Sequence, residues 1–170
     1  MAADIYKPEL WHDFFVMVGG GAAALTGLVF VAMSLNIDMI AGDATHRHRA
    51  IGTLVGFAAA FMTCALVIMG GQDHRAVGFE WLVVGSLAGV IYVNGYIQAI
   101  RRDGSSLGRS LSRLVVGTAL YLGQVVGAIL FMLGYIAGLY VAAVTMIILQ
   151  AWGITGAWLL VIGVHREKAG

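Results

Sequence analysis

Residues 114–164 read LVVGTALYLGQVVGAILFMLGYIAGLYVAAVTMIILQAWGITGAWLLVIGV, a run of 51 residues without Asp, Glu, Lys, Arg or His. As one α-helix this run would be about 76 Å long, whereas the hydrocarbon core of a bilayer is about 30 Å thick. The stretch GYIAG at residues 134–138 interrupts the run with two glycines beside an aromatic ring. We therefore expect a tight turn there and two membrane-spanning helices, over residues 114–134 and 139–164.

Three further apolar runs precede this pair, over about residues 14–36, 51–70 and 79–100, and each is long enough to cross a bilayer. The whole chain is 60% hydrophobic and 11% charged, against about 45–50% and about 25% in a typical soluble domain. We therefore expect an all-α polytopic membrane protein, a compact bundle of five transmembrane helices that forms a single domain over residues 1–170.

The ten Lys and Arg residues are unevenly distributed between the segments that join these runs. Two lie in the N-terminal segment and the second connection, and eight lie in the first and third connections and the C-terminal segment. Because short cytoplasmic loops are enriched in Lys and Arg, this asymmetry predicts that the N-terminus is outside and the C-terminus inside. The eight basic residues of the inner side are Arg47, Arg49, Arg101, Arg102, Arg109, Arg113, Arg166 and Lys168.

The basic residues of the first and third connections are candidates for contact with anionic lipid headgroups, which attract Lys and Arg beside a membrane. The alternative is that they only hold the topology, and the two interpretations are compatible. The third connection, residues 101–113, is expected to be the longest loop of the chain. The candidate lipid contacts are Arg47, Arg49, Arg101, Arg102, Arg109 and Arg113.

Small residues recur at helical spacing in all five runs, which predicts closely crossing helices because little else than close packing holds helices together in lipid. These stripes serve either packing within one chain or assembly with a second copy or a partner subunit. We expect the stripe of the first run to be the one that faces outward. The packing residues are Gly20, Ala24, Gly27, Gly52, Gly56, Gly85, Gly89, Gly123, Gly127 and Gly153.

Uncharged polar residues form a candidate intramembrane patch of Tyr121, Gln124, Gln150 and Asn94. Gln124 and Gln150 are each expected about 15 Å from the outer face, where adjacent antiparallel helices would let their amides pair. The patch is either a structural hydrogen bond between helices or the lining of a site for a small molecule, water or a lipid headgroup.

The interior of the five runs holds no ionisable residue, which argues against a proton-coupled carrier, a voltage sensor or a haem site at membrane depth. The single cysteine, Cys64, excludes an intramolecular disulfide and a cysteine-based metal cluster. His and acidic residues near the outer face have no metal-ligand spacing. We expect no catalytic residue, no metal, no cofactor and no nucleic-acid partner.

The stretches WHDFF at residues 11–15 and GAAALTGLVFVA at residues 21–32 resemble small polytopic bacterial inner-membrane proteins of uncharacterised function. This resemblance covers residues 11–35 and implies a multi-pass protein of the bacterial inner (plasma) membrane. The expected function is that of an accessory, regulatory or structural membrane subunit that assembles through small-residue helix faces without catalysis. The alternative is a homo-oligomeric channel or a carrier that binds a small solute or a lipid.

Overall fold

The structure is a computed structural model that describes residues 7–42, 44–102 and 107–168. Within these ranges the chain forms helices and no β-strand. All of the helices except α2 are long and apolar enough to cross a membrane. The expected all-α bundle of five spans is therefore confirmed. The helices are α1 (Pro8–Leu35), α2 (Ile37–Gly42), α3 (Ala44–Ile68), α4 (His74–Arg102), α5 (Leu107–Met132) and α6 (Ala137–Lys168).

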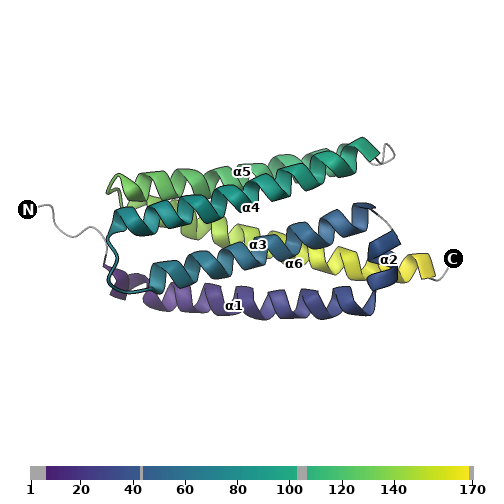
Figure 1. Cartoon of the computed structure of the whole chain (residues 1–170), viewed down its shortest axis with the longest axis horizontal. Coiled ribbons are helices and arrows are strands. Elements are labelled where there is room, and N and C mark those ends of the chain that lie inside the picture. Colours follow the sequence, from purple (N-terminus) through teal and green to yellow (C-terminus); the bar gives the residue numbers. More distant parts are fainter. Residues whose placement is uncertain (1–6, 43, 103–106, 169–170) are drawn as a thin grey trace, which may run out of the picture.

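The five long helices run side by side along one axis, and α1 begins at the end opposite to the end at which α6 stops (Figure 1). We call the end at which α1 begins the amino end of the bundle, and the end at which α6 stops the carboxyl end. The α3–α4 connection and the α5–α6 turn also lie at the amino end, whereas α2 and the facing ends of α4 and α5 lie at the carboxyl end.

The α5–α6 turn lies where the GYIAG stretch places it. The backbone N–H of Gly134 donates to the carbonyl of Phe131 at 2.9 Å, and that of Tyr135 donates to the carbonyl of Leu130 at 2.9 Å. Gly134 has φ of 87°, the left-handed conformation that glycine adopts without strain. This pair of bonds is the Schellman ending of a helix, and it turns the chain back so that α6 can begin at Ala137.

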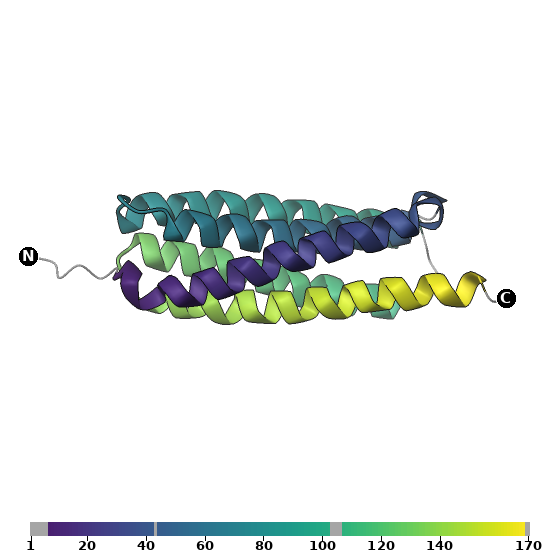
Figure 2. The same ribbon diagram turned by 90° about the horizontal axis from the view of Figure 1, so that it is seen from below.

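The helices α3 and α6 hold the bundle together. α3 packs on α1, α4 and α6, while α6 packs on α5, α3 and α1. α1 lies in the outer layer, in front of its neighbours when the bundle is viewed from below (Figure 2). Glycines allow the closest approaches: a Cβ atom at Gly19 would lie 2.9 Å from the Cβ of Cys64, and one at Gly138 would lie 2.5 Å from the carbonyl oxygen of Gly127. The helices therefore meet nearly backbone to backbone at these points.

The interior of the bundle changes character along its axis. The carboxyl half is built around Ala88 and three tyrosines, Tyr92, Tyr96 and Tyr121. The amino half holds a larger and mostly aliphatic and aromatic cluster, which we call the amino-half cluster. Its buried members are Phe15, Val18, Cys64, Val67, Val77, Trp81, Ala128, Phe131, Leu139, Ala142 and Met146.

Helices at the carboxyl end extend further than the sequence predicts. α4 continues to Arg102 and α5 begins at Leu107, so the expected loop over residues 101–113 is wrong, and only residues 103–106 remain between the helices, outside the described part. The basic stretch at 46–49 likewise belongs to α3 and not to a loop. The Ser and Gly content of residues 104–112 masked the helical spacing of Leu107, Leu111 and Leu114, which recur at intervals of four and three.

Candidate functional site

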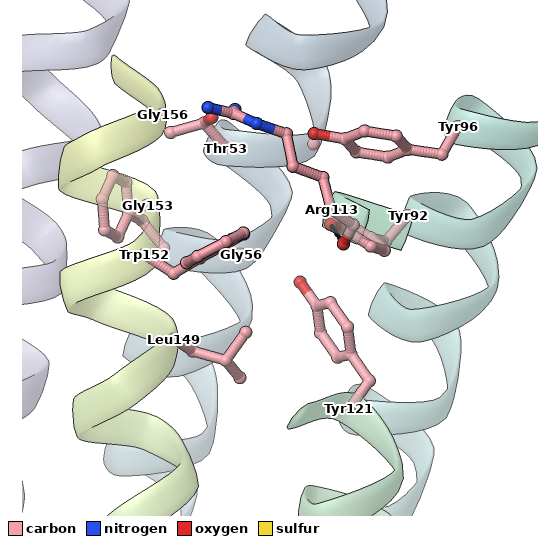
Figure 3. A pocket seen from close by; sticks show the side chains of 12 residues that line it. Thr53, Gly56, Tyr92, Tyr96, Arg113, Tyr121, Leu149, Trp152, Gly153 and Gly156 are labelled. Carbon is pink, nitrogen blue, oxygen red and sulfur yellow. Dashed lines mark hydrogen bonds between the residues drawn. The ribbon is translucent and has the colours of Figure 1, made fainter. Parts of the chain in front are cut away.

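A cavity of about 40 Å³ lies between α3, α4, α5 and α6 in the carboxyl half of the bundle (Figure 3). This volume is enough for a few water molecules or one small polar group. Aromatic rings form most of its wall, and glycines from α3 and α6 form much of the rest. The lining residues are Gly52, Thr53, Gly56 and Phe57 of α3, Tyr92 and Tyr96 of α4, Arg113 and Tyr121 of α5, and Leu149, Trp152, Gly153 and Gly156 of α6.

The small residues of α3 and α6 make room for these rings. A Cβ atom at Gly56 would lie 3.3 Å from the hydroxyl oxygen of Tyr121, and one at Gly153 would lie 2.8 Å from the ring of Phe57. The glycine stripes predicted from the sequence therefore pack against aromatic rings in this half, and the space left beside those rings is the cavity.

Arg113 is the one charged residue among the described residues that line the cavity. Its side chain is half-buried, and its Cζ atom lies 5.9 Å from the centroid of the Trp152 ring. A cation–π contact of this kind contributes about 0.5–2 kcal/mol. Figure 3 shows the guanidinium reaching across the cavity from α5 toward Thr53 and Gly156. Arg113 thus gives the Trp152 ring a packing partner inside the bundle.

Tyr92 fixes the wall opposite α6. Its hydroxyl donates to the backbone carbonyl of Arg113 at 2.8 Å, and its ring centroid lies 4.7 Å from that of Tyr96 and 5.3 Å from that of Tyr121. The ring lies against Gly117 on α5, where a Cβ atom would overlap it. Tyr92 thus joins α4 to α5 through both packing and a hydrogen bond.

Gln124 forms a second polar centre, deeper in the bundle and buried. Its Oε1 accepts from the indole Nε1 of Trp81 at 2.8 Å, and its Nε2 donates to the carbonyl of Ala142 at 2.9 Å and to Oγ1 of Thr145 at 2.6 Å. These bonds join α4, α5 and α6. Because each atom of the amide has a partner, the geometry is that of a structural cross-link between helices.

The structure brings the four residues of the predicted polar patch together only in part: Tyr121 lines one cavity with Gln124 and an outer groove with Asn94, while Gln150 lies elsewhere. Tyr121 and Gln124 are both buried and together line a smaller cavity of about 20 Å³. Gln150 instead donates to the carbonyl of Val18 on α1 at 2.9 Å, so the two glutamine amides do not pair. Asn94 is exposed on the outside of the bundle, in a groove between α4 and α5.

The rotation of α6 explains why the glutamines do not meet. Thr145 faces Gln124, and Gln150 is five residues further along, which turns its side chain about 140° around the helix axis. Gln150 therefore points toward α1 and joins that outer helix to the bundle.

The six arginines predicted to contact lipid come from helix segments at the carboxyl end. Arg47 and Arg101 are exposed, as a headgroup contact requires, whereas Arg113 is turned into the cavity. The side chains of the other three, Arg49, Arg102 and Arg109, lie outside the described residues.

The small face of α1 is the one stripe that the described bundle leaves uncovered. A Cβ atom at Gly20 or Gly27 would meet nothing within 4 Å, and Ala24 between them is exposed. By contrast, the predicted packing glycines of the other spans each have a neighbour from another helix within 4 Å. These are Gly52, Gly56, Gly85, Gly89, Gly123, Gly127 and Gly153.

Sequence reasoning missed several residues that matter here. One of them is Trp81, which is 1% exposed and whose indole donates a hydrogen bond to Gln124. Tyr92 and Tyr96, four residues apart and thus on one helix face, were a signal of an aromatic wall. At the amino end, His12 contacts Asp13 at 3.3 Å, and the described residues bring together no group of three metal-ligating side chains.

Comparison of the chain with protein-family models, with curated proteins and with solved structures found no match. The resemblance of residues 11–35 to small inner-membrane proteins therefore stays a prediction. The fold and the site define a five-helix apolar bundle with an aromatic cavity in one half, and a functional proposal has to start from that geometry.

Proposed function

We propose that the chain is an integral membrane subunit, accessory or regulatory in role, that acts by packing against other membrane helices and not by catalysis. One observation carries this proposal: the Gly20, Ala24 and Gly27 face of α1 is exposed, while the small faces of the other spans are filled within the chain. The first candidate for its partner is α1 of a second copy, and the other is a helix of a larger membrane complex.

The shape of the α1 face suits a close helix contact. The small residues form a shallow floor, and larger exposed side chains stand beside it, including Met17 at 67% and Leu28 at 66% exposure. In lipid, a floor of Gly and Ala lets a second backbone approach closely and gain dispersion contacts that bulky residues would prevent. Two copies of the same floor are self-complementary, as a two-fold symmetric interface requires.

The proposed location is the bacterial inner membrane with the N-terminus outside. Support comes from the backbone positions of the eight basic residues of the inner side, all of which belong to helix segments at the carboxyl end. Short basic segments stay in the cytoplasm, so this end would face inward.

The assembly proposal is tested with Ala24→Leu, compared with Ala119→Leu on α5. Both alanines are exposed, so both variants add the same side chain to an outer surface, but only Ala24 lies in the small face. We expect Ala24→Leu to shift the purified protein toward the mass of one chain, by about tenfold or more in the dissociation constant, because the bulk separates the two floors. The measurement is light scattering in mild detergent.

Ala119→Leu should leave the mass unchanged, and circular dichroism should show equal helix content in both variants. If the wild-type protein already has the mass of a single chain in detergent, the two variants are compared by chemical cross-linking in native membranes instead. If Ala24→Leu and Ala119→Leu capture the same partners there, the α1 face has no role in assembly.

A carrier or channel remains the second candidate, and the cavity is the observation that favours it. The cavity lies in the carboxyl half, while buried side chains of the amino-half cluster, such as Phe131 and Leu139, fill the other half. This arrangement suits binding of a small solute or lipid group from one side better than a pore through one copy. Solute flux is measured in liposomes that contain either the wild type or Ala24→Leu. A channel that needs several copies should lose flux in the variant, whereas a subunit without transport should show no flux with either protein.

A further inference from the structure

We propose that the cavity of the carboxyl half binds a single anionic oxygen group, a carboxylate or a phosphate, through the guanidinium of Arg113. The inference starts from the direction of that side chain. Arg113 points into the bundle and contacts the Trp152 ring, whereas Arg101 at the end of α4 is exposed. Figure 3 shows the guanidinium reaching from α5 toward Thr53 and Gly156, which also line the cavity.

Arg113 has no acidic partner among the described residues that line the cavity. The Trp152 ring interacts with a cation through its π-face, which leaves the N–H groups at the edge of the guanidinium plane to donate hydrogen bonds. A guanidinium that is partly removed from water is most stable when a carboxylate or phosphate oxygen accepts from that edge.

A second polar group of the cavity also favours an anion. The hydroxyl of Tyr96 points toward the side chain of Arg113 (Figure 3). A phenol can donate a hydrogen bond to an anionic oxygen. The volume of about 40 Å³ limits the ligand at this level to one such group.

Two sources can supply this chemistry. Tyr96 lies two residues before the end of its apolar span at Gln98, and Arg113 lies two residues after the start of its span at Leu111. This is the depth at which the bilayer gives way to headgroups. A soluble anion and the phosphate of an anionic phospholipid can therefore both reach the guanidinium.

The first experiment measures the thermal unfolding of purified protein in neutral detergent with inorganic phosphate or acetate, at an ionic strength kept constant with sodium chloride. We expect a saturable rise in Tm for the wild type, because a ligand that binds only the folded state stabilises it. Arg113→Gln should weaken the apparent affinity by about tenfold or more, since it removes the charge-assisted bonds. The matched control Arg75→Gln removes an exposed arginine near the start of α4, at the amino end, and should respond as the wild type does.

The second experiment compares nanodiscs of phosphatidylcholine with nanodiscs that also contain phosphatidylglycerol. If the ligand is a lipid headgroup, phosphatidylglycerol should raise Tm for the wild type and for Arg75→Gln but not for Arg113→Gln, and soluble anions should have little effect. A rise with soluble anions alone identifies a free anion as the source. If neither anion raises Tm in a way that depends on Arg113, the proposal is wrong.

Should Arg113→Gln fail to fold, Arg113→Lys and Tyr96→Phe carry the same test. Lysine keeps the charge but lacks the planar fork, and Tyr96→Phe removes only a hydroxyl. Each should weaken anion binding by about threefold or more, and binding equal to that of the wild type in both would overturn the proposal. The site does not depend on the α1 face, so Ala24→Leu should bind the anion unchanged.

Discussion

The two halves of this bundle solve the packing of five helices in lipid in different ways. In the amino half, glycines bring backbones together: a Cβ atom at Gly138 would lie 2.5 Å from the carbonyl oxygen of Gly127. In the carboxyl half, glycines make room for rings instead. A Cβ atom added at Gly52 would be at ordinary contact distance, 3.6 Å from the ring of Tyr92. The same residue type therefore brings backbones together in one half and accommodates aromatic rings in the other.

This difference assigns separate roles to the halves. Close backbone contact tolerates no added atom, so the amino half is expected to be the rigid part of the fold. Aromatic rings around a cavity leave polar groups such as Arg113 accessible, so the carboxyl half is where a ligand can bind. The contrast predicts which substitutions the protein tolerates, and the following tests can break it.

The largest effect is expected for Gly138→Ala compared with Gly52→Ala. The first introduces a methyl group against the backbone of α5 and should destabilise the fold by about 1–3 kcal/mol. The second adds the same methyl group in the interior of α3, where it would be at an ordinary contact distance from its neighbours. It should leave the stability unchanged or raise it by up to about 1 kcal/mol, because alanine has the higher helix propensity.

The measurement is the unfolding of both variants in detergent with increasing sodium dodecyl sulfate, followed by circular dichroism. Equal destabilisation by Gly138→Ala and Gly52→Ala would show that the two halves are packed alike, and the distinction between them would not hold.

A smaller effect is expected at the centre of the bundle, where the halves meet. Gln124→Leu removes the acceptor of the Trp81 indole, which is 1% exposed, and should cost about 1–2 kcal/mol because a buried N–H is left unpaired. The double variant Trp81→Phe with Gln124→Leu removes both partners and should lose less stability than the sum of the single variants. Additive losses in the same unfolding assay would mean that the bond contributes nothing specific.

The depth of each residue along the bundle could be predicted from the sequence. Run lengths gave the five helices, and the GYIAG stretch marked the α5–α6 turn because a hairpin there needs a residue that tolerates the positive φ of Gly134. The outward direction of the Gly20 and Gly27 face was also expected, and the uncovered surface of α1 agrees with it.

The rotation of each helix about its own axis could not be predicted in the same way. Asn94 and Gln124 are both uncharged amides in apolar runs, yet Asn94 faces outward and Gln124 is buried. Hydropathy differs little around a helix such as α4, so the contacts between helices decide which side chains meet. For the same reason the sequence alone could not distinguish Arg113 from Arg101, although only Arg113 turns into the cavity.

The smallest effect is expected for Tyr92→Phe, which tests how much the carboxyl half depends on hydrogen bonds. The variant keeps the ring against Gly117 and removes the hydroxyl that donates to the Arg113 carbonyl at 2.8 Å. That carbonyl lies beside a cavity that can hold water, so the loss should be about 0.6 kcal/mol, the average for such bonds in membrane proteins. The measurement is thermal unfolding, and the control is Tyr135→Phe, which changes an exposed tyrosine of the amino end. A loss as large as that of Gln124→Leu would mean that the cavity wall is as tightly coupled as the bundle centre, and the carboxyl half would then not be the adaptable part of the molecule.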